Sequence, residues 1–399
     1  MKQLFRIGAC AALILGAVLG TSASAQSPKG PISDGGPEAS LSKVFKDIEA
    51  RRLDSALERV DALLAVYPNF RLAHLIRGDL LLARSRPLTG FGNAPTAPPE
   101  KVAELRDEAI ARLQAYHARP TKNQVPRYLL QMRPDQKYAI VVDTKKSRLY
   151  LYANERGRPR FVADYYITHG KEGAKKSREG DKRTPLGVYH VVSEVPKKKL
   201  TDFYGSGAFP INYPNEYDRL LGRAGHGIWL HGVPRDTMSR PPKASDGCVV
   251  LANADLQALA SRLQLGLTPV IISDEVEWLS LDDWQQERSA LQGQIEAWRR
   301  DWESGDTERY LQHYAEKFTS DSATRTQWGA RKRAIAKGKT WVQVRLDNIS
   351  MFRDPGQEEM VVVTFDQDYR SNNLKQRDGK RQYWIKEGGK WKILYEGQA

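Results

Sequence analysis

One stretch of the sequence, 225–251 (GHGIWLHGVPRDTMSRPPKASDGCVVL), holds two histidines and a cysteine, each next to a glycine. A cysteine nucleophile needs an imidazole that takes up the thiol proton and backbone N–H groups that face the developing oxyanion. His231 and Cys248 offer the imidazole and the thiol, and the glycine before Cys248 lets the backbone approach a substrate closely. Spacing alone leaves two interpretations open, a catalytic pair and two unrelated core residues.

The number of cysteines bears on the same question. The first 25 residues combine a basic start, an apolar run and Ala-Ser-Ala at 23–25, which predicts a cleavable signal peptide and export to the periplasm. Cleavage there removes Cys10, so Cys248 keeps no intramolecular partner in an oxidising compartment. A lone thiol of this kind is a buried inert residue, an intermolecular bridge or a reactive nucleophile, and composition leaves all three open.

The charge of the chain narrows the choice of partners. The formal net charge is +14, and such a surplus favours polyanionic partners. For an exported protein we expect no nucleic acid, which leaves carboxylate-rich cell wall or anionic lipid surfaces. After the predicted signal peptide, no window reaches the ~18 apolar residues of a membrane-spanning helix.

Changes in residue pattern predict a multidomain α+β protein. Residues 26–40 are rich in Pro, Gly and Ser and predict a flexible leader. Residues 41–133 show a helical period, and because one pair of such helices cannot bury its apolar face alone, we expect it to pack on a neighbour or to mediate a dimer. Residues 135–274 contain strand-like runs and predict a mostly β domain, and residues 278–399 predict a tryptophan-rich helix followed by a curved antiparallel sheet.

Three motifs in the same order resemble the L,D-transpeptidase (YkuD-type) catalytic domain family. The family signature is His-Gly followed further along by Ser-x-Gly-Cys, which reads here His231-Gly232 and Ser245-Asp246-Gly247-Cys248. Upstream, GDKRTPLGVYHV (180–191) is similar to the family's Arg-Thr-Pro-x-Gly-x-Tyr segment, and YAIVVDTKKSRLYLY (138–152) resembles its opening hairpin. The resemblance covers 135–274.

The resemblance implies a role for each matching position. Cys248 would be the nucleophile and His231 the general base and acid, with the Gly232 carbonyl orienting the imidazole. The amides of Gly247 and Cys248 would form the oxyanion hole, and the Ser245 hydroxyl would support the turn. The family's chemistry implies no metal and no organic cofactor.

The implied substrate is a peptidoglycan stem peptide. The thiolate would attack the carbonyl at the L-centre of diaminopimelate in a tetrapeptide, release D-alanine and leave a thioester. An amine from another stem would then form a cross-link, as in a transpeptidase, whereas water would trim the stem to a tripeptide, as in a carboxypeptidase.

Two positions depart from the common form of the motif, which is Ser-His-Gly-Cys with an Arg two places later. Asp246 replaces that His and Val250 replaces that Arg. With the flanking helical and C-terminal regions, this divergence resembles the L,D-carboxypeptidases of helical cell-shape control. Three functions therefore stay open: transpeptidase, carboxypeptidase and non-catalytic wall-binding scaffold.

Three further residues are candidate substrate-binding groups: His226, Arg183 and Asp246. His226 either assists His231 or holds a glycine-rich turn. Arg183 lies in the Arg-Thr-Pro motif and either binds a stem carboxylate with two hydrogen bonds or is a solvated surface residue. His169 repeats the His-Gly dipeptide without a cysteine at the right spacing, so we give it no catalytic role.

The C-terminal segment 278–399 resembles the cone-shaped fold related to nuclear transport factor two. Eight of the nine tryptophans lie in it, which indicates a separate hydrophobic core. Folds of this kind often carry a pocket, so we expect it to bind a small ligand or a wall fragment and not to supply catalytic groups.

Overall fold

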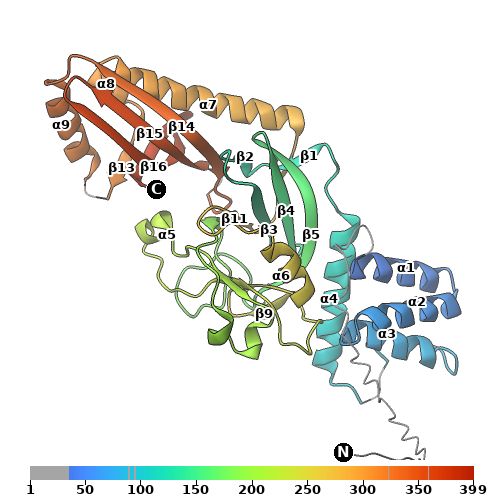
Figure 1. Cartoon of the computed structure of the whole chain (residues 1–399). Coiled ribbons are helices and arrows are strands. Elements are labelled where there is room, and N and C mark those ends of the chain that lie inside the picture. The colour runs from blue at the N-terminus through green and yellow to red at the C-terminus, as the bar shows by residue number, and fades with distance from the viewer. Residues whose placement is uncertain (1–35, 89, 94–95, 322, 358) are drawn as a thin grey trace, which may run out of the picture. The chain divides into compact units, whose positions relative to one another are not determined.

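The structure, a computed structural model, describes residues 36–88, 90–93, 96–321, 323–357 and 359–399. The described residues all belong to one compact unit, whose helices and strands are labelled in Figure 1. The predicted signal peptide and most of the predicted leader lie outside the described residues.

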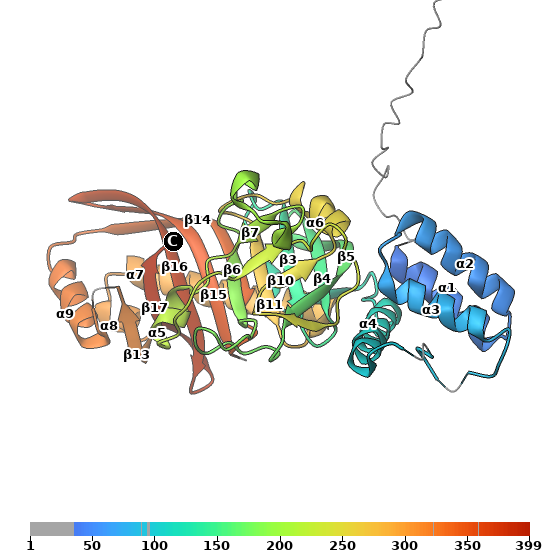
Figure 2. The same cartoon turned by 90° about the horizontal axis from the view of Figure 1, so that it is seen from below.

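Four helices form the N-terminal region: α1 (Pro37–Glu49), α2 (Leu53–Val66), α3 (Arg71–Leu82) and α4 (Pro99–His117). Helices α1, α2 and α3 lie side by side (Figure 2), and their apolar faces share one core that contains Leu41, Val60 and Phe70. Helix α1 begins inside the segment 26–40 that we expected to be a leader, because its apolar residues complete this core.

The central region is built on a nine-stranded sheet, as the strand-like pattern predicts. Its order is β6-β11-β3-β4-β5-β10-β8-β7, with β9 pairing β5. The strands are β3 (Tyr138–Asp143), β4 (Arg148–Glu155), β5 (Arg158–Gly170), β6 (Gly187–His190), β7 (Ala208–Pro210), β8 (Trp229–His231), β9 (Lys243–Ser245), β10 (Val249–Leu251) and β11 (Pro269–Ser273). The helical segments are η1 (Lys197–Lys199), η2 (Asp202–Tyr204), α5 (Glu216–Leu220) and α6 (Asn253–Ala260).

The C-terminal region packs helices on a six-stranded sheet of order β13-β17-β16-β15-β14-β2, in which β2 is Leu129–Gln131. Its helices are α7 (Leu281–Glu303), α8 (Thr307–Leu311) and α9 (Arg325–Ala336). Its strands are β12 (Trp278–Ser280), which lies outside that sheet, β13 (Tyr314–Ser320), β14 (Val342–Arg353), β15 (Met360–Ser371), β16 (Leu374–Glu387) and β17 (Lys390–Gln398). Trp298 and Trp384 are fully buried between α7 and the sheet, so the tryptophans do build a separate core.

The predicted helical region, 41–133, also contains two short strands after its last helix. The helices stop at His117, and two short strands follow, β1 (Gln124–Pro126) and β2 (Leu129–Gln131). Strand β1 pairs with β12 and β2 pairs with β14, both far along the chain. These strands depend on distant partners, which a local residue pattern does not reveal.

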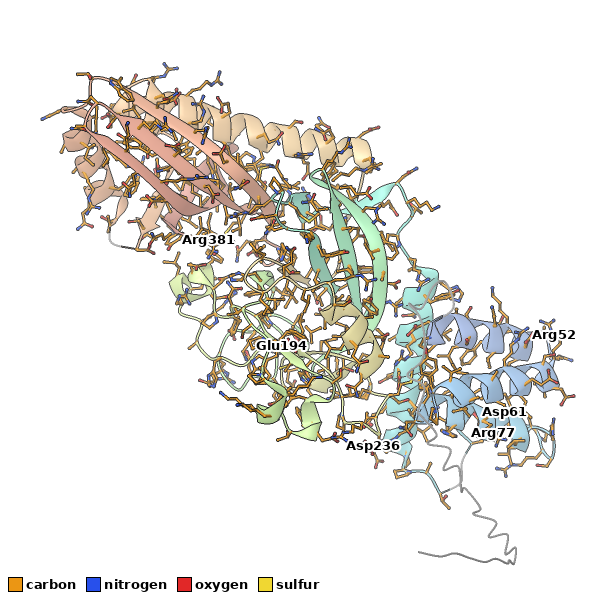
Figure 3. All side chains as sticks on the ribbon, in the orientation of Figure 1. Arg52, Asp61, Arg77, Glu194, Asp236 and Arg381 are labelled. Atoms are coloured by element: carbon orange, nitrogen blue, oxygen red, sulfur yellow. The ribbon has the colours of Figure 1, made fainter. Side chains whose placement is uncertain are left out.

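Ion pairs join elements within and between these regions. Asp61 of α2 and Arg77 of α3, both labelled in Figure 3, form one at 2.6 Å. Arg381 of β16 forms another with Glu216 of α5 at 2.6 Å. Tyr383 on the same strand donates to Glu216 at 3.2 Å, so the C-terminal sheet is attached to the central region. None of the helices in the described part of the chain has the length and apolar content needed to cross a bilayer.

Candidate active site

Two adjacent parallel strands bring the predicted histidine and cysteine to one face of the sheet. In the register of β8 and β10, Leu230 lies opposite Val249 and His231 opposite Val250. Leu230 and Val249 belong to the core of the central sheet. Because side chains alternate along a strand, His231 and Val250 face away from that core, and so does Cys248, two residues before Val250.

The His231 imidazole is held in the tautomer that a general base requires. Its side chain is 2% exposed, and Nδ1 donates to the carbonyl oxygen of Gly232 at 2.7 Å. Burial lowers the pKa of His231 to about 4, although the Gly232 bond acts in the opposite direction. The ring also packs against Phe203 and Tyr204, with centroids 5.7 and 5.2 Å away. The imidazole is therefore neutral at pH 7, and its Nε2 can accept a proton.

The carbonyl that orients His231 is itself fixed by its neighbours. The Gly232 N–H donates to the carbonyl oxygens of Tyr204 and Gly207, each at 3.2 Å. Asn253 accepts from the N–H groups of Ser206 and Val233 at 2.9 and 3.2 Å. A Cβ at position 232 would lie 2.3 Å from Asn253 Oδ1, so the site requires glycine there. The sequence did not indicate Asn253, because an Asn at the start of a helix is typical of a cap.

The Cys248 thiol is partly buried and is in no disulfide within the described residues. Its Sγ donates to the carbonyl oxygen of Gly227 at 3.3 Å. Burial raises the pKa of Cys248 to about 11, although a backbone bond from Trp229 and the charges of Arg240 and Lys176 oppose that rise. In this structure the thiol is therefore protonated and points its proton to the Gly227 carbonyl.

A serine hydroxyl holds the turn before the thiol. Ser245 Oγ donates to the Cys248 carbonyl oxygen at 2.7 Å and accepts from the Gly247 N–H at 3.2 Å. The Gly247 N–H, which we expected in the oxyanion hole, thus already donates to Ser245 Oγ. Gly247 has φ +126°, and a Cβ there would lie 2.7 Å from the carbonyl oxygen of Arg183.

A second hydroxyl, which the sequence analysis did not single out, ties this turn to the Arg-Thr-Pro motif. Thr184 is fully buried, donates from Oγ1 to the Gly247 carbonyl at 3.0 Å and accepts from the Gly170 N–H at 2.9 Å. In the sequence, only its place in the Arg-Thr-Pro motif pointed to Thr184. Nothing in the linear pattern of the motif links it to residue 247.

The three candidate substrate-binding residues lie around the same turn, each bonded to another group. Arg183 donates from Nη1 to the Ala174 carbonyl at 3.1 Å, so its guanidinium braces a loop. Asp246 is exposed and pairs with Lys171 at 3.1 Å. His226 is 87% exposed, with Nδ1 3.3 Å from a Glu179 carboxylate oxygen, next to the glycine that accepts from the thiol.

No cluster of three or more His, Cys, Asp or Glu side chains able to hold a metal ion occurs in the described part of the chain.

Comparison with known proteins identifies two domains in the chain. Residues 137–272 match the L,D-transpeptidase catalytic domain, and residues 290–397 match the Cds6 C-terminal NTF2-like domain. A search of curated proteins finds no match. The N-terminal helices, which end at His117, lie outside both matched ranges.

Similar solved structures cover about two thirds of the chain. Bd1075 of Bdellovibrio bacteriovorus is 28% identical, with a TM-score of 0.62 over 69% of this chain and 98% of that one. The helical cell shape determining protein Pgp2 of Campylobacter jejuni is 28% identical, with a TM-score of 0.58 over 67% of this chain and 95% of that one. The chain thus carries an L,D-transpeptidase catalytic domain at residues 137–272, followed by an NTF2-like domain at residues 290–397.

Proposed function

We propose that the protein is an exported enzyme that acts on peptidoglycan stem tetrapeptides at the bond between diaminopimelate and D-alanine, through a thioester on Cys248. The observation that carries the proposal is the 2.7 Å bond from His231 Nδ1 to the Gly232 carbonyl, on the face that also holds Cys248. That bond leaves Nε2 of a neutral imidazole free to take the thiol proton.

Each step moves a proton through His231. The thiol turns from the Gly227 carbonyl and gives its proton to Nε2 while sulfur bonds to the substrate carbonyl carbon. The resulting oxyanion collapses, the C–N bond breaks, and D-alanine leaves with the proton from the imidazole. An incoming water or stem amine attacks the thioester and gives its proton to His231, which returns it to the sulfur.

Release of D-alanine from a defined tetrapeptide tests this proposal. We expect release by the wild type and none by Cys248→Ala, with Lys197→Ala, an exposed lysine far along the chain from the turn, as a control that keeps full activity. Absence of release by the folded wild type under reducing conditions would contradict the proposal. Wall binding unaffected by Cys248→Ala would then favour a scaffold.

Hydrolysis is the second candidate reaction, and Val250 favours it. The common motif carries an arginine at this position, whereas Val250 is 2% exposed and pairs with His231. The position thus offers no guanidinium to a carboxylate of an acceptor stem. Mass spectrometry separates the outcomes, because a tripeptide means hydrolysis and a dimer linked between two diaminopimelates means transpeptidation.

Export is proposed from residues 1–25 alone. N-terminal sequencing of protein recovered from the periplasm should begin at Gln26. A chain that keeps its first residues in the cytoplasm would contradict this part of the proposal.

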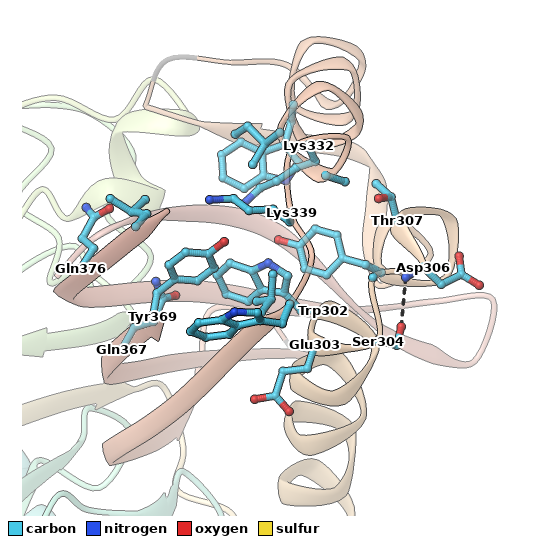
Figure 4. A pocket seen from close by; sticks show the side chains of 18 of the residues that line it. Trp302, Glu303, Ser304, Asp306, Thr307, Lys332, Lys339, Gln367, Tyr369 and Gln376 are labelled. Carbon is cyan, nitrogen blue, oxygen red and sulfur yellow. Dashed lines mark hydrogen bonds between the residues drawn. The ribbon is translucent and has the colours of Figure 1, made fainter. Parts of the chain in front are cut away.

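The cavity of the C-terminal domain is proposed to bind an anionic fragment of the wall (Figure 4). It measures about 320 Å³. The ammonium of Lys332 lies 4.4 Å from the centroid of Trp328 and 4.8 Å from that of Trp302. In the described part of the chain, Lys332 forms no ion pair with a carboxylate. The ammonium of Lys339 lies over the Tyr369 ring and faces the same cavity.

Two buried polar atoms in the same lining lack partners within the described residues. They are Trp328 Nε1, a donor, and Gln367 Oε1, an acceptor. Unpaired buried polar groups are costly, so a ligand that pairs them would stabilise the domain. A cation, a donor and an acceptor between aromatic walls fit an acidic sugar with hydroxyl or amide groups.

Titration with soluble muropeptides, followed by tryptophan fluorescence, tests the cavity. We expect Lys332→Met to weaken binding at least tenfold, and Lys337→Met, exposed and outside the lining, to leave it unchanged. Equal affinity of the two variants would contradict an anion site at Lys332.

A further inference from the structure

The segment 234–245 connects the strand of His231 to the turn of Cys248, and β5 with the residue after it, Lys171, holds it along one side. Four hydrogen bonds do so: Tyr166 OH to the Arg240 carbonyl (2.8 Å), Thr168 Oγ1 to that of Pro241 (3.0 Å), His169 N–H to that of Pro242 (2.8 Å) and Lys171 N–H to that of Ser245 (2.8 Å). These bonds therefore fix the backbone of the segment at four positions before Cys248.

The N-terminal helices hold the same segment from the other side. The Leu72 N–H, in the first turn of α3, donates to Ser239 Oγ at 3.1 Å, and the bond is buried. The residue before α3 is Phe70, whose side chain cannot cap a helix, so Ser239 satisfies one of the N–H groups that a helix start leaves unpaired. Met238 packs against the core of the four helices.

The helices also fix the tyrosine that holds Arg240. The guanidinium of Arg112, on α4, lies 4.0 Å from the centroid of the Tyr166 ring and is buried. Glu38 and Glu108 pair with this guanidinium at 2.6 and 2.8 Å. Two contacts, through Ser239 and through Tyr166, thus run from the helices to the segment.

Hydrogen bonds connect the segment to the turn that carries the nucleophile. Arg240 donates from Nη2 to the Ala244 carbonyl at 2.6 Å, directly before Ser245. Ser245 Oγ in turn holds the Gly247 N–H and the Cys248 carbonyl. A shift of the segment therefore moves the groups that define the turn.

We propose that the N-terminal helical region positions the Cys248 turn for acyl transfer, with Ser239 and Tyr166 as its positioning residues. The inference rests on the proposed function of Cys248. The helices lie outside both matched ranges, so these contacts reach the catalytic domain from another part of the chain. In this proposal, the contacts of Ser239 and Tyr166 affect the rate of acyl transfer although they lie away from the reacting groups.

The experiment compares single substitutions in the full chain. Tyr166→Phe removes the bond to Arg240 but keeps the ring under Arg112, and Ser239→Ala removes the acceptor of Leu72, whereas Ser239→Thr keeps a hydroxyl. The matched control is Tyr128→Phe, which loses an equivalent bond from a buried tyrosine to a backbone carbonyl (Glu275, 2.9 Å) outside the segment. D-alanine release, thermal unfolding and the pH profile of Cys248 alkylation by iodoacetamide are measured for each.

We expect Tyr166→Phe and Ser239→Ala to lower kcat by roughly 5- to 10-fold, because small displacements of a reacting group cost rate, with KM within about twofold. Their alkylation midpoint should move down in pH, since a loosened turn admits water to the sulfur. Ser239→Thr should recover most of the rate, and Tyr128→Phe should match the wild type in both readouts.

Three results would overturn the inference. One is a wild-type rate and alkylation profile in both variants, and another is the same loss in Tyr128→Phe, which would reflect general destabilisation. The third is equal loss in Ser239→Thr and Ser239→Ala, which also decides the question if Tyr166→Phe does not fold. Because alkylation needs no wall peptide, the test remains informative even if no variant, including the wild type, releases D-alanine.

Discussion

His231 donates from Nδ1 to the carbonyl oxygen of Gly232, its own neighbour in the chain, over 2.7 Å. No carboxylate is needed to fix this tautomer, since Asn253 and the Tyr204 loop hold the backbone at Gly232. A neutral imidazole and a protonated thiol therefore coexist in the resting site. Nucleophilic sulfur would form only when substrate enters and the thiol leaves the Gly227 carbonyl.

The first prediction concerns the reactivity of the thiol without substrate. Burial raises the pKa of Cys248 to about 11, from an ordinary value of 9.0, so little thiolate exists at pH 8. Because each pH unit changes the thiolate fraction tenfold, alkylation at pH 8 should be about 100-fold slower than for a free cysteine. The rate should rise with pH through about 11, as followed by mass spectrometry of the iodoacetamide adduct.

A resting ion pair between imidazolium and thiolate would give the opposite profile. Alkylation would then be fast at pH 6 and would show little change up to pH 9. Denatured protein, in which Cys248 is an ordinary thiol, provides the reference for the intrinsic rate.

The second prediction concerns the acid limit of turnover. Burial lowers the pKa of His231 to about 4, so the imidazole stays neutral below the usual range of histidine. The kcat/KM for D-alanine release should therefore persist to about pH 5 and fall only as the ring takes up a proton near pH 4. His231→Asn should lower kcat at least about 100-fold, the usual contribution of a general base.

His313→Asn is a suitable control, because His313 pairs with Asp301 in the C-terminal domain. Turnover that already falls by half near pH 6.5 would show that His231 titrates as an ordinary histidine.

The third prediction uses the second buried histidine, His169, to test stability against pH. It is 3% exposed, and burial, aided by the charge of Lys243, lowers its pKa to about 4. Between pH 6.5 and 4 the unfolded chain binds a proton at this residue that the folded chain does not bind. The free energy of unfolding must therefore fall as the pH decreases through that window, by about 3 kcal/mol from this group.

Urea unfolding of the wild type and His169→Gln at pH 7 and pH 4 measures this term. The loss on acidification should be about 3 kcal/mol larger for the wild type, because other titrating groups are common to both proteins and cancel. An equal loss in the two proteins would mean that His169 is protonated in the folded state.

Local patterns in the sequence predicted the catalytic residues better than the residues that hold them in place. His231, Cys248 and the Ser245 turn lie within one short stretch, and adjacent strands bring them to one face as the motif implies. Ser239 and Thr184 act through partners 167 and 63 residues away, and no periodicity records such contacts. The same reason explains the two short strands after His117, which exist only through pairing with distant residues.

The expected oxyanion role of the Gly247 amide depends on geometry that no motif specifies. Its N–H donates to Ser245 Oγ, so a carbonyl oxygen entering the site would have to displace that bond. Motif matching assigns a residue type to a position, whereas the direction of one N–H depends on backbone dihedrals and on neighbours such as Arg183 and Thr184.

The last prediction tests the backbone at Gly247. An alanine there would have to adopt φ +126° and would place its Cβ 2.7 Å from the Arg183 carbonyl oxygen and 3.1 Å from Ile228 Cδ1. Left-handed backbone costs an alanine roughly 1–2 kcal/mol, and the contact with a rigid backbone oxygen adds to that cost. We expect Gly247→Ala to lower the free energy of unfolding by more than about 2 kcal/mol and D-alanine release by more than tenfold, since the turn and its bond to Thr184 must shift.

Gly222→Ala is the matched control, because Gly222 has φ +67° but open space around the added Cβ, so only the backbone cost remains. If the two variants lose equal stability and both keep full activity, the close packing of Gly247 on Arg183 does not define the nucleophile turn.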